Sequence, residues 1–412
     1  MTKASVAILV ALSAILTCAL RADAADITGM GPFDAQTEIV RLRNFGPKGL
    51  ESLLQQYDKS RDPKLIPMID AVAAQHDDVW SRLYWYTDLS KAEAAAKEQH
   101  KPILYLRLLG KLSDEYSCAN SRFFRTILYA NSTVSKMLRE QFILVWCSER
   151  PVPTVTIDFG DGRVLKRTIT GNSIHYVLDS DGNVIDALPG IYAPRKFADL
   201  LSRARWQVLT GDESTHKGYW VQSQNALLVE WNSSSSSSSS QTNNGEAERF
   251  GPPNAVEAGR VAISKGAVEQ PMLAMLSPDF ANQIQASIDN ADSVAWQQMA
   301  MQYQQQSMLD AHSIALIRSQ NPAKYADSAV LQKTVDQFQS LIAQDTVQNN
   351  YKLRRQILDW LMAGKGQVAL DDLNRRVYSE LFLTPRSDQW LGMLPESQYT
   401  ALDGDGVCPL PQ

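Results

Sequence analysis

The chain has 412 residues, enough for two or three domains with hydrophobic cores of their own. Its 44% hydrophobic and 8% aromatic residues are typical of a globular protein and exclude a largely disordered one. The 40 basic and 45 acidic residues are interspersed, which excludes the basic surface of a nucleic-acid or acidic-membrane binder, and we expect no nucleic-acid partner.

The N-terminus has the pattern of a signal peptide over residues 1–24. Lys3 precedes an apolar run over 6–20, and Ala22-Asp23-Ala24 has the small-x-small pattern of a cleavage site, so Ala25 would begin the mature chain. We therefore predict an exported protein, periplasmic or extracellular, with no stable membrane span after cleavage. An uncleaved anchor, or a lipoprotein attached through Cys18, is the alternative.

The cysteines and histidines predict neither a metal nor a cofactor. Cleavage leaves Cys118, Cys147 and Cys408, an odd number, so at least one thiol is free or pairs between molecules. None of the cysteines has C-x-x-C spacing and the five histidines are scattered, which argues against zinc. The Asp-Gly repeat at 403–406 is similar to the start of a calcium loop, but the rest of that loop is missing.

Residues 25–86 are predicted to form a helical leader. Leu50, Leu53 and Leu54 recur at helical spacing, which indicates a buried stripe. The aromatic residues Trp80 and Tyr84-Trp85-Tyr86 at its end are typical of core packing.

Residues 87–231 predict an α/β domain. The expected elements are an alanine-rich helix at 88–97, a strand at 102–109, a helical stretch at 120–140 broken near 131–133, a strand at 142–146, hairpins at 154–168 and 175–185, and a closing helix at 194–204. Strands that alternate with helices, followed by hairpins and a last helix, predict a sandwich with a mixed sheet.

A run of eight serines, Ser233–Ser240, separates this domain from the rest of the chain. Such a run cannot bury apolar surface, so we predict a flexible linker over 232–253. Beyond it, residues 254–412 predict an all-α domain with a C-terminal tail, because apolar residues such as Leu331, Val335 and Phe338 follow helical spacing.

The order and spacing of about residues 86–205 resembles the thioredoxin superfamily, in particular its exported members. Lys101-Pro102-Ile103-Leu104 is similar to the family's first long strand, and 177–182 to its "FLD-x-DG" hairpin. Cys118-Ala119-Asn120-Ser121 lies where the family's C-x-x-C motif opens a helix. The resemblance implies a thioredoxin-like mixed-sheet sandwich, in which the hairpin at 154–168 is an insertion.

The sequence departs from this family at its active site. Ser121 replaces the second active-site cysteine, and Ser173 falls at the position of the family's cis-proline. An intramolecular dithiol cycle through Cys118 and Ser121 is therefore impossible. The candidate catalytic residues are Cys118 and Ser121.

A helix N-terminus, with Arg122 and Arg125 close by, would favour the Cys118 thiolate. Cys147, which we expect to end the neighbouring strand beside Cys118, is the candidate resolving thiol for a mixed disulfide. Two hypotheses follow. The first is a binding or scaffold module, with an unidentified protein partner and no dithiol turnover. The second is a monothiol redox protein, at most a thiol-disulfide oxidoreductase with one active-site cysteine. The exposure and ionisation of Cys118 separate them.

Overall fold

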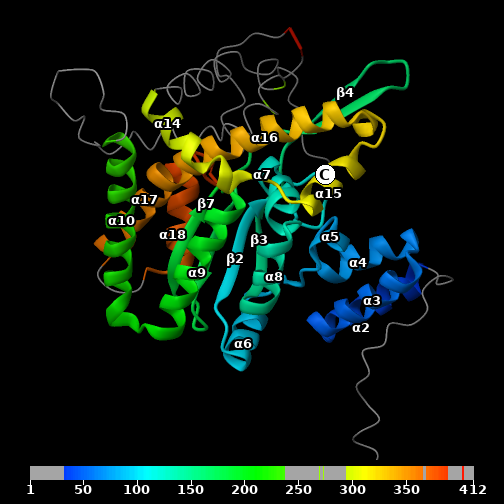
Figure 1. The fold of residues 1–412 in the computed structure, drawn as a ribbon. Helices are drawn as coiled ribbons and strands as arrows, with labels where there is room; N and C mark the ends of the chain where they lie inside the picture. The colour runs from blue at the N-terminus through cyan, green and yellow to red at the C-terminus, as the bar shows by residue number, and fades with distance from the viewer. Residues whose placement is uncertain are drawn as a thin grey trace, which may run out of the picture. The chain divides into compact units, whose positions relative to one another are not determined.

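A computed structural model describes residues 32–236, 269, 272, 294–364, 368–387 and 401–402. The chain divides into two compact units, Met1–Trp85 and Tyr86–Gln412, which are described separately (Figure 1). The predicted signal peptide, Cys18, Cys408 and the Asp-Gly repeat lie outside the described residues.

The first unit is helical, as the leader prediction required. Its helices are α2 (Pro32–Asn44), α3 (Pro47–Ser60), the short η1 (Pro63–Leu65), α4 (Ile66–Ala73) and α5 (Asp78–Ser81). The three leucines at helical spacing, Leu50, Leu53 and Leu54, are buried on α3. The Trp85 ring is also buried, and its indole N–H donates to Gln75 Oε1 at 2.8 Å. The apolar stripe therefore forms the core of this unit.

The second unit contains a five-stranded mixed sheet, which confirms the predicted α/β class. The strands of this sheet are β1 (Trp85–Tyr86), which begins at the last residue of the first unit, β2 (Ile103–Leu109), β3 (Ile143–Arg150), β6 (Ile174–Leu178) and β7 (Val184–Pro189), in the spatial order β1-β3-β2-β6-β7. Strand β2 is parallel to β3 and antiparallel to β6, and β6 forms an antiparallel hairpin with β7. All residues of β2 are buried, as expected for a central strand covered on both faces.

Helices surround the sheet. They are α6 (Leu89–Gln99), α7 (Ala119–Phe123), the π-helical η2 (Phe124–Tyr129), α8 (Ser132–Gln141), α9 (Pro194–Thr210) and α10 (Glu213–Ser236). Asn131 caps α8 by accepting from the Thr133 and Val134 N–H groups, and so breaks the helical stretch where the sequence predicts. The rings of Phe124 and Phe197 pack on the His175 ring, so η2 and α9 meet over β6.

The closing helix is longer than predicted, and a second one follows it. Helix α9 continues to Thr210, and α10 runs through Ser233–Ser236, so the predicted linker 232–253 begins inside a helix. The Trp220 indole N–H donates to the Ile185 carbonyl at 2.8 Å, which anchors α10 to β7. Residues 237–253 lie outside the described part of the chain.

The hairpin predicted at 154–168 is present. Strands β4 (Thr154–Asp158) and β5 (Val164–Thr168) pair in antiparallel register and form a separate two-stranded sheet, which extends away from the five-stranded one (Figure 1).

The C-terminal region is helical, as predicted. Its described elements are α14 (Val294–Tyr303), η3 (Gln305–Ser307), α15 (Ala311–Gln320), η4 (Lys324–Ala326), α16 (Ser328–Gln348), η5 (Asn349–Arg354), α17 (Arg355–Ala363), α18 (Leu370–Arg376) and η6 (Val377–Leu381). A buried ion pair joins Arg354 of η5 to Asp186 of β7, with Nη2 and Oδ2 2.7 Å apart. This helical region therefore docks on the sheet and belongs to the same compact unit.

Candidate thiol site

Cys118 lies at the C-terminal end of β2, where it is the N-cap residue of α7. Its backbone N–H donates to the Leu109 carbonyl at 3.3 Å, and its own carbonyl accepts from the Arg122 N–H at 3.1 Å. These two bonds fix Cys118 between strand and helix. Its exposed fraction is 0%, so a partner cannot reach the sulfur in this conformation.

Two serine hydroxyls contact the Cys118 sulfur. Ser173 Oγ lies 3.0 Å from Sγ, and Ser121 Oγ lies 3.4 Å from it. The Ser121 hydroxyl donates its proton to the Cys118 carbonyl at 2.8 Å, so toward the sulfur it can only accept. This arrangement suits a protonated thiol that donates to Ser121, while Ser173 is free to donate to the sulfur. The structure thus brings together Cys118, Ser121 and Ser173.

The loop Thr170–Ser173 covers the thiol. Gly171 has φ +89°, and a Cβ atom built there would lie 2.9 Å from Cys118 Cβ and 3.3 Å from Leu109 Cβ. The position therefore requires glycine both for its backbone conformation and for the close approach.

The two candidate arginines are not among the hydrogen-bond partners of the sulfur in the described part of the chain. Arg125 is buried, and its guanidinium donates to the carbonyls of Asp114 at 3.2 Å and Glu115 at 3.4 Å. It holds the loop that precedes Cys118. The Arg122 side chain is half-buried. In the described part of the chain, the polar side-chain contacts of the Cys118 sulfur come from the two serines.

The expectation that Cys147 ends its strand beside Cys118 is wrong. Strand β3 continues to Arg150, and Arg150 is the residue that pairs with Leu109, the neighbour of Cys118. Cys147 pairs with Arg107 instead, three residue steps along the strand from Arg150, or about 10 Å. A disulfide needs Cα atoms within about 7 Å, so these cysteines cannot pair without backbone movement. Both are free thiols.

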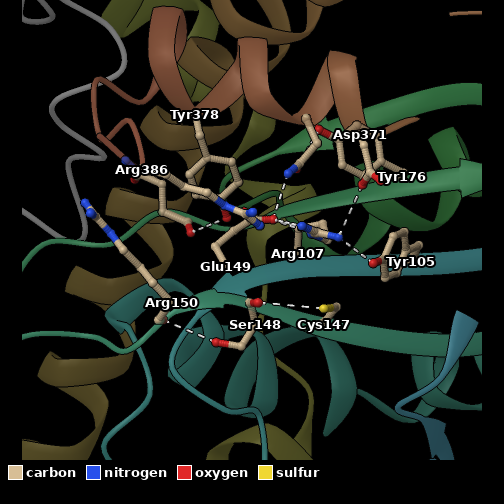
Figure 2. A network of polar contacts seen from close by, with 12 residues as sticks. Tyr105, Arg107, Cys147, Ser148, Glu149, Arg150, Tyr176, Asp371, Tyr378 and Arg386 are labelled. Atoms are coloured by element: carbon tan, nitrogen blue, oxygen red, sulfur yellow. Dashed lines mark hydrogen bonds and ion pairs between the residues drawn. The ribbon is translucent and has the colours of Figure 1, made fainter. Parts of the chain in front are cut away.

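The sequence analysis missed a polar network beside Cys147 (Figure 2). The Arg107 guanidinium forms an ion pair with the Glu149 carboxylate and donates to the Tyr105 hydroxyl at 2.6 Å. Burial raises the pKa of Tyr105 to about 12. The side chains of Arg107 and Glu149 are 7% and 4% exposed. The one signal in the sequence is the position of Arg107 inside an otherwise apolar strand.

A second buried pair lies beneath the site. The Tyr129 hydroxyl is 2.6 Å from His175 Nε2, and both side chains are fully buried. Burial lowers the pKa of His175 to about 3, so its ring is neutral near pH 7. Burial raises the pKa of Tyr129 well above its usual range. His175 is therefore a sheet residue with a hydrogen-bond partner.

Comparisons with family models, curated proteins and solved structures found no match to this chain. Among the residues that the structure describes, no group of His, Cys, Asp and Glu side chains could hold a metal ion. No described helix has the length and apolar character needed to cross a bilayer. What the site offers is one thiol between two hydroxyls, closed from solvent.

Proposed function

We propose that the protein is an exported, thioredoxin-like binding module that works through a protein partner and carries out no dithiol turnover. The strand order β1-β3-β2-β6-β7 supports a thioredoxin-like arrangement, with β2 parallel to β3 and antiparallel to β6. The placement of Cys118 at the start of the helix that follows β2 supports it as well.

The main support for the absence of dithiol turnover is the burial of Cys118 and the lack, among the described residues, of a second thiol within its reach. Its sulfur is fully buried, its helical neighbour at 121 is a serine, and the Cys147 thiol is too far along β3 to resolve a mixed disulfide. Reduction of a disulfide by one protein needs two thiols that can reach each other. This chain presents one thiol at the site, and that thiol is packed.

Export is supported by the pattern of residues 1–24. Mass spectrometry of the protein secreted by its cell should give a mature chain that begins at Ala25. A chain that retains Met1 would contradict the cleavage.

A monothiol redox role is the second candidate, and the contact between Ser173 and the sulfur favours it. A hydroxyl 3.0 Å from Sγ would donate to a thiolate if the site opened. The thiolate would attack a client disulfide, form a mixed disulfide through Cys118 and expel the client's other sulfur as a thiolate. A small external thiol would then attack the mixed disulfide, restore Cys118 and take the place of its sulfur.

A disulfide-reduction assay separates the two roles. Insulin reduction is followed with excess glutathione for the wild type, Cys118→Ser and Ser121→Cys. We expect the wild type and Ser121→Cys both to match Cys118→Ser, because residues 118 and 121 are fully buried and a client disulfide cannot reach them. Wild-type turnover that Cys118→Ser abolishes would refute the binding-module proposal and favour the monothiol role.

A further inference from the structure

The loop over Cys118 is held by residues from the C-terminal half of the chain. The Tyr378 hydroxyl on η6 donates to the Asn172 carbonyl at 3.0 Å, and the Thr170 N–H donates to the Glu269 carboxylate at 2.9 Å. Residues on both sides of Gly171 are thus hydrogen-bonded to a region more than 90 positions away. Since Gly171 and Ser173 contact Cys118, these bonds hold the thiol closed.

Tyr378 is itself buried. Its side chain is 3% exposed, and its ring packs edge-on against Phe382 at 5.1 Å between centroids. Burial raises the pKa of its phenol well above the usual range, so the hydroxyl is protonated and can donate to Asn172.

The segment that carries Tyr378 buries the apolar side chains of Leu373, Val377 and Leu381, and polar contacts also join it to the sheet (Figure 2). Asn374 of α18 donates from Nδ2 to Glu149 Oε1 at 2.7 Å and accepts from the Tyr176 hydroxyl at 3.2 Å. Arg386, which is 66% exposed, donates to Glu149 Oε2 at 2.8 Å. Buried apolar packing and these hydrogen bonds together keep the segment on the sheet.

We infer that the segment Leu370–Leu381, formed by α18 and η6, is an intramolecular cover that keeps the Cys118 site closed until the segment is displaced. Tyr378 is its central contact, because one hydroxyl links the cover to the loop over the thiol. The inference rests on the proposed function only in taking Cys118 as the site. It adds that the thiol is held latent by this contact.

The test is the alkylation rate of Cys118 in the native full-length protein, measured by iodoacetamide and peptide mass spectrometry. Tyr378→Phe removes one hydroxyl and keeps the ring. We expect wild-type Cys118 to react at least about tenfold more slowly than the half-buried Cys147. In Tyr378→Phe the Cys118 rate should rise about fivefold, the population shift for loss of one buried hydrogen bond, while the Cys147 rate stays unchanged.

A matched control is Tyr325→Phe on η4, whose hydroxyl makes no hydrogen bond to the described residues, and its Cys118 rate should equal that of the wild type. Rates at low urea separate opening of the cover from global unfolding, because a local opening depends weakly on denaturant and a global one steeply.

Three results would overturn the cover. The first is an equal Cys118 alkylation rate in Tyr378→Phe and in the wild type. The second is a faster Cys118 rate in Tyr378→Phe that depends on urea as steeply as global unfolding does. The third is a wild-type Cys118 that reacts as fast as Cys147. The proposed function fails in a different assay, if the wild type reduces insulin. That result would not change the ratio of Cys118 alkylation rates between Tyr378→Phe and the wild type, which tests the cover alone.

Discussion

Arg354→Met should lower the free energy of unfolding of the second unit more than a substitution at the surface does, because it leaves Asp186 buried without its counter-charge. The Arg354 guanidinium holds the Asp186 carboxylate at two points, Nε to Oδ1 at 3.0 Å and Nη2 to Oδ2 at 2.7 Å. Their side chains are 3% and 0% exposed. Burial alone would lower the pKa of Arg354, but Asp186 outweighs it and the pKa is raised.

The size of the effect follows from burial. Breaking a buried ion pair from one side costs about 3–5 kcal/mol. Two bonds to Asp186 survive the substitution, from the Tyr219 hydroxyl at 2.6 Å and the Ala187 N–H at 2.8 Å, so we expect a loss near the lower end, about 3 kcal/mol.

Urea unfolding followed by circular dichroism measures the free energy of unfolding. The control is Arg375→Met, whose ion pair with Asp372 is 73% and 66% exposed, and which should change stability by less than about 0.5 kcal/mol. An Arg354→Met loss below about 1 kcal/mol would refute the docking of the helical region on β7 through this pair.

Two further substitutions test the surroundings of the thiol. Gly171→Ala should destabilise the protein by about 1–3 kcal/mol more than Gly160→Ala in urea unfolding, because both have positive φ but only the first would crowd Cys118; equal losses would contradict the close approach. His175 is neutral in the folded protein, and in the unfolded protein it takes up a proton with a pKa near 6.5. Its contribution to the free energy of unfolding is therefore fully present above pH 6.5 and is lost as the pH drops toward 3. Between pH 7 and 5 the wild type should lose about 2 kcal/mol that His175→Gln does not lose, and parallel pH profiles would rule out a buried neutral histidine.

The local pattern of the sequence predicts much of the α/β part. The apolar run at 102–109 and the Asp181-Gly182 turn are short-range signals, and they place β2 and the β6–β7 hairpin. The cap at Asn131 is equally local. The sequence therefore predicts those elements whose formation depends on residues close together in the chain.

The end of β3 could not be predicted, because the residues after Cys147 are polar. Ser148, Glu149 and Arg150 read as a loop, yet Glu149 is buried in the strand since Arg107 neutralises it across the sheet. That partner is 42 positions away, and periodicity carries no information about it.

The cover over Cys118 was missed for the same reason. Tyr378 reaches Asn172 across 206 positions, and within η6 it has the pattern of an ordinary core tyrosine. The sequence identifies the cysteine, while its accessibility depends on contacts from another part of the chain.

The most direct test of a closed thiol site is the order in which the two described cysteines react in the native wild-type protein. Intact mass and peptide mapping during iodoacetamide treatment should show Cys147 modified first and Cys118 at least about tenfold more slowly. Modification of Cys118 before Cys147 in native buffer would contradict the account.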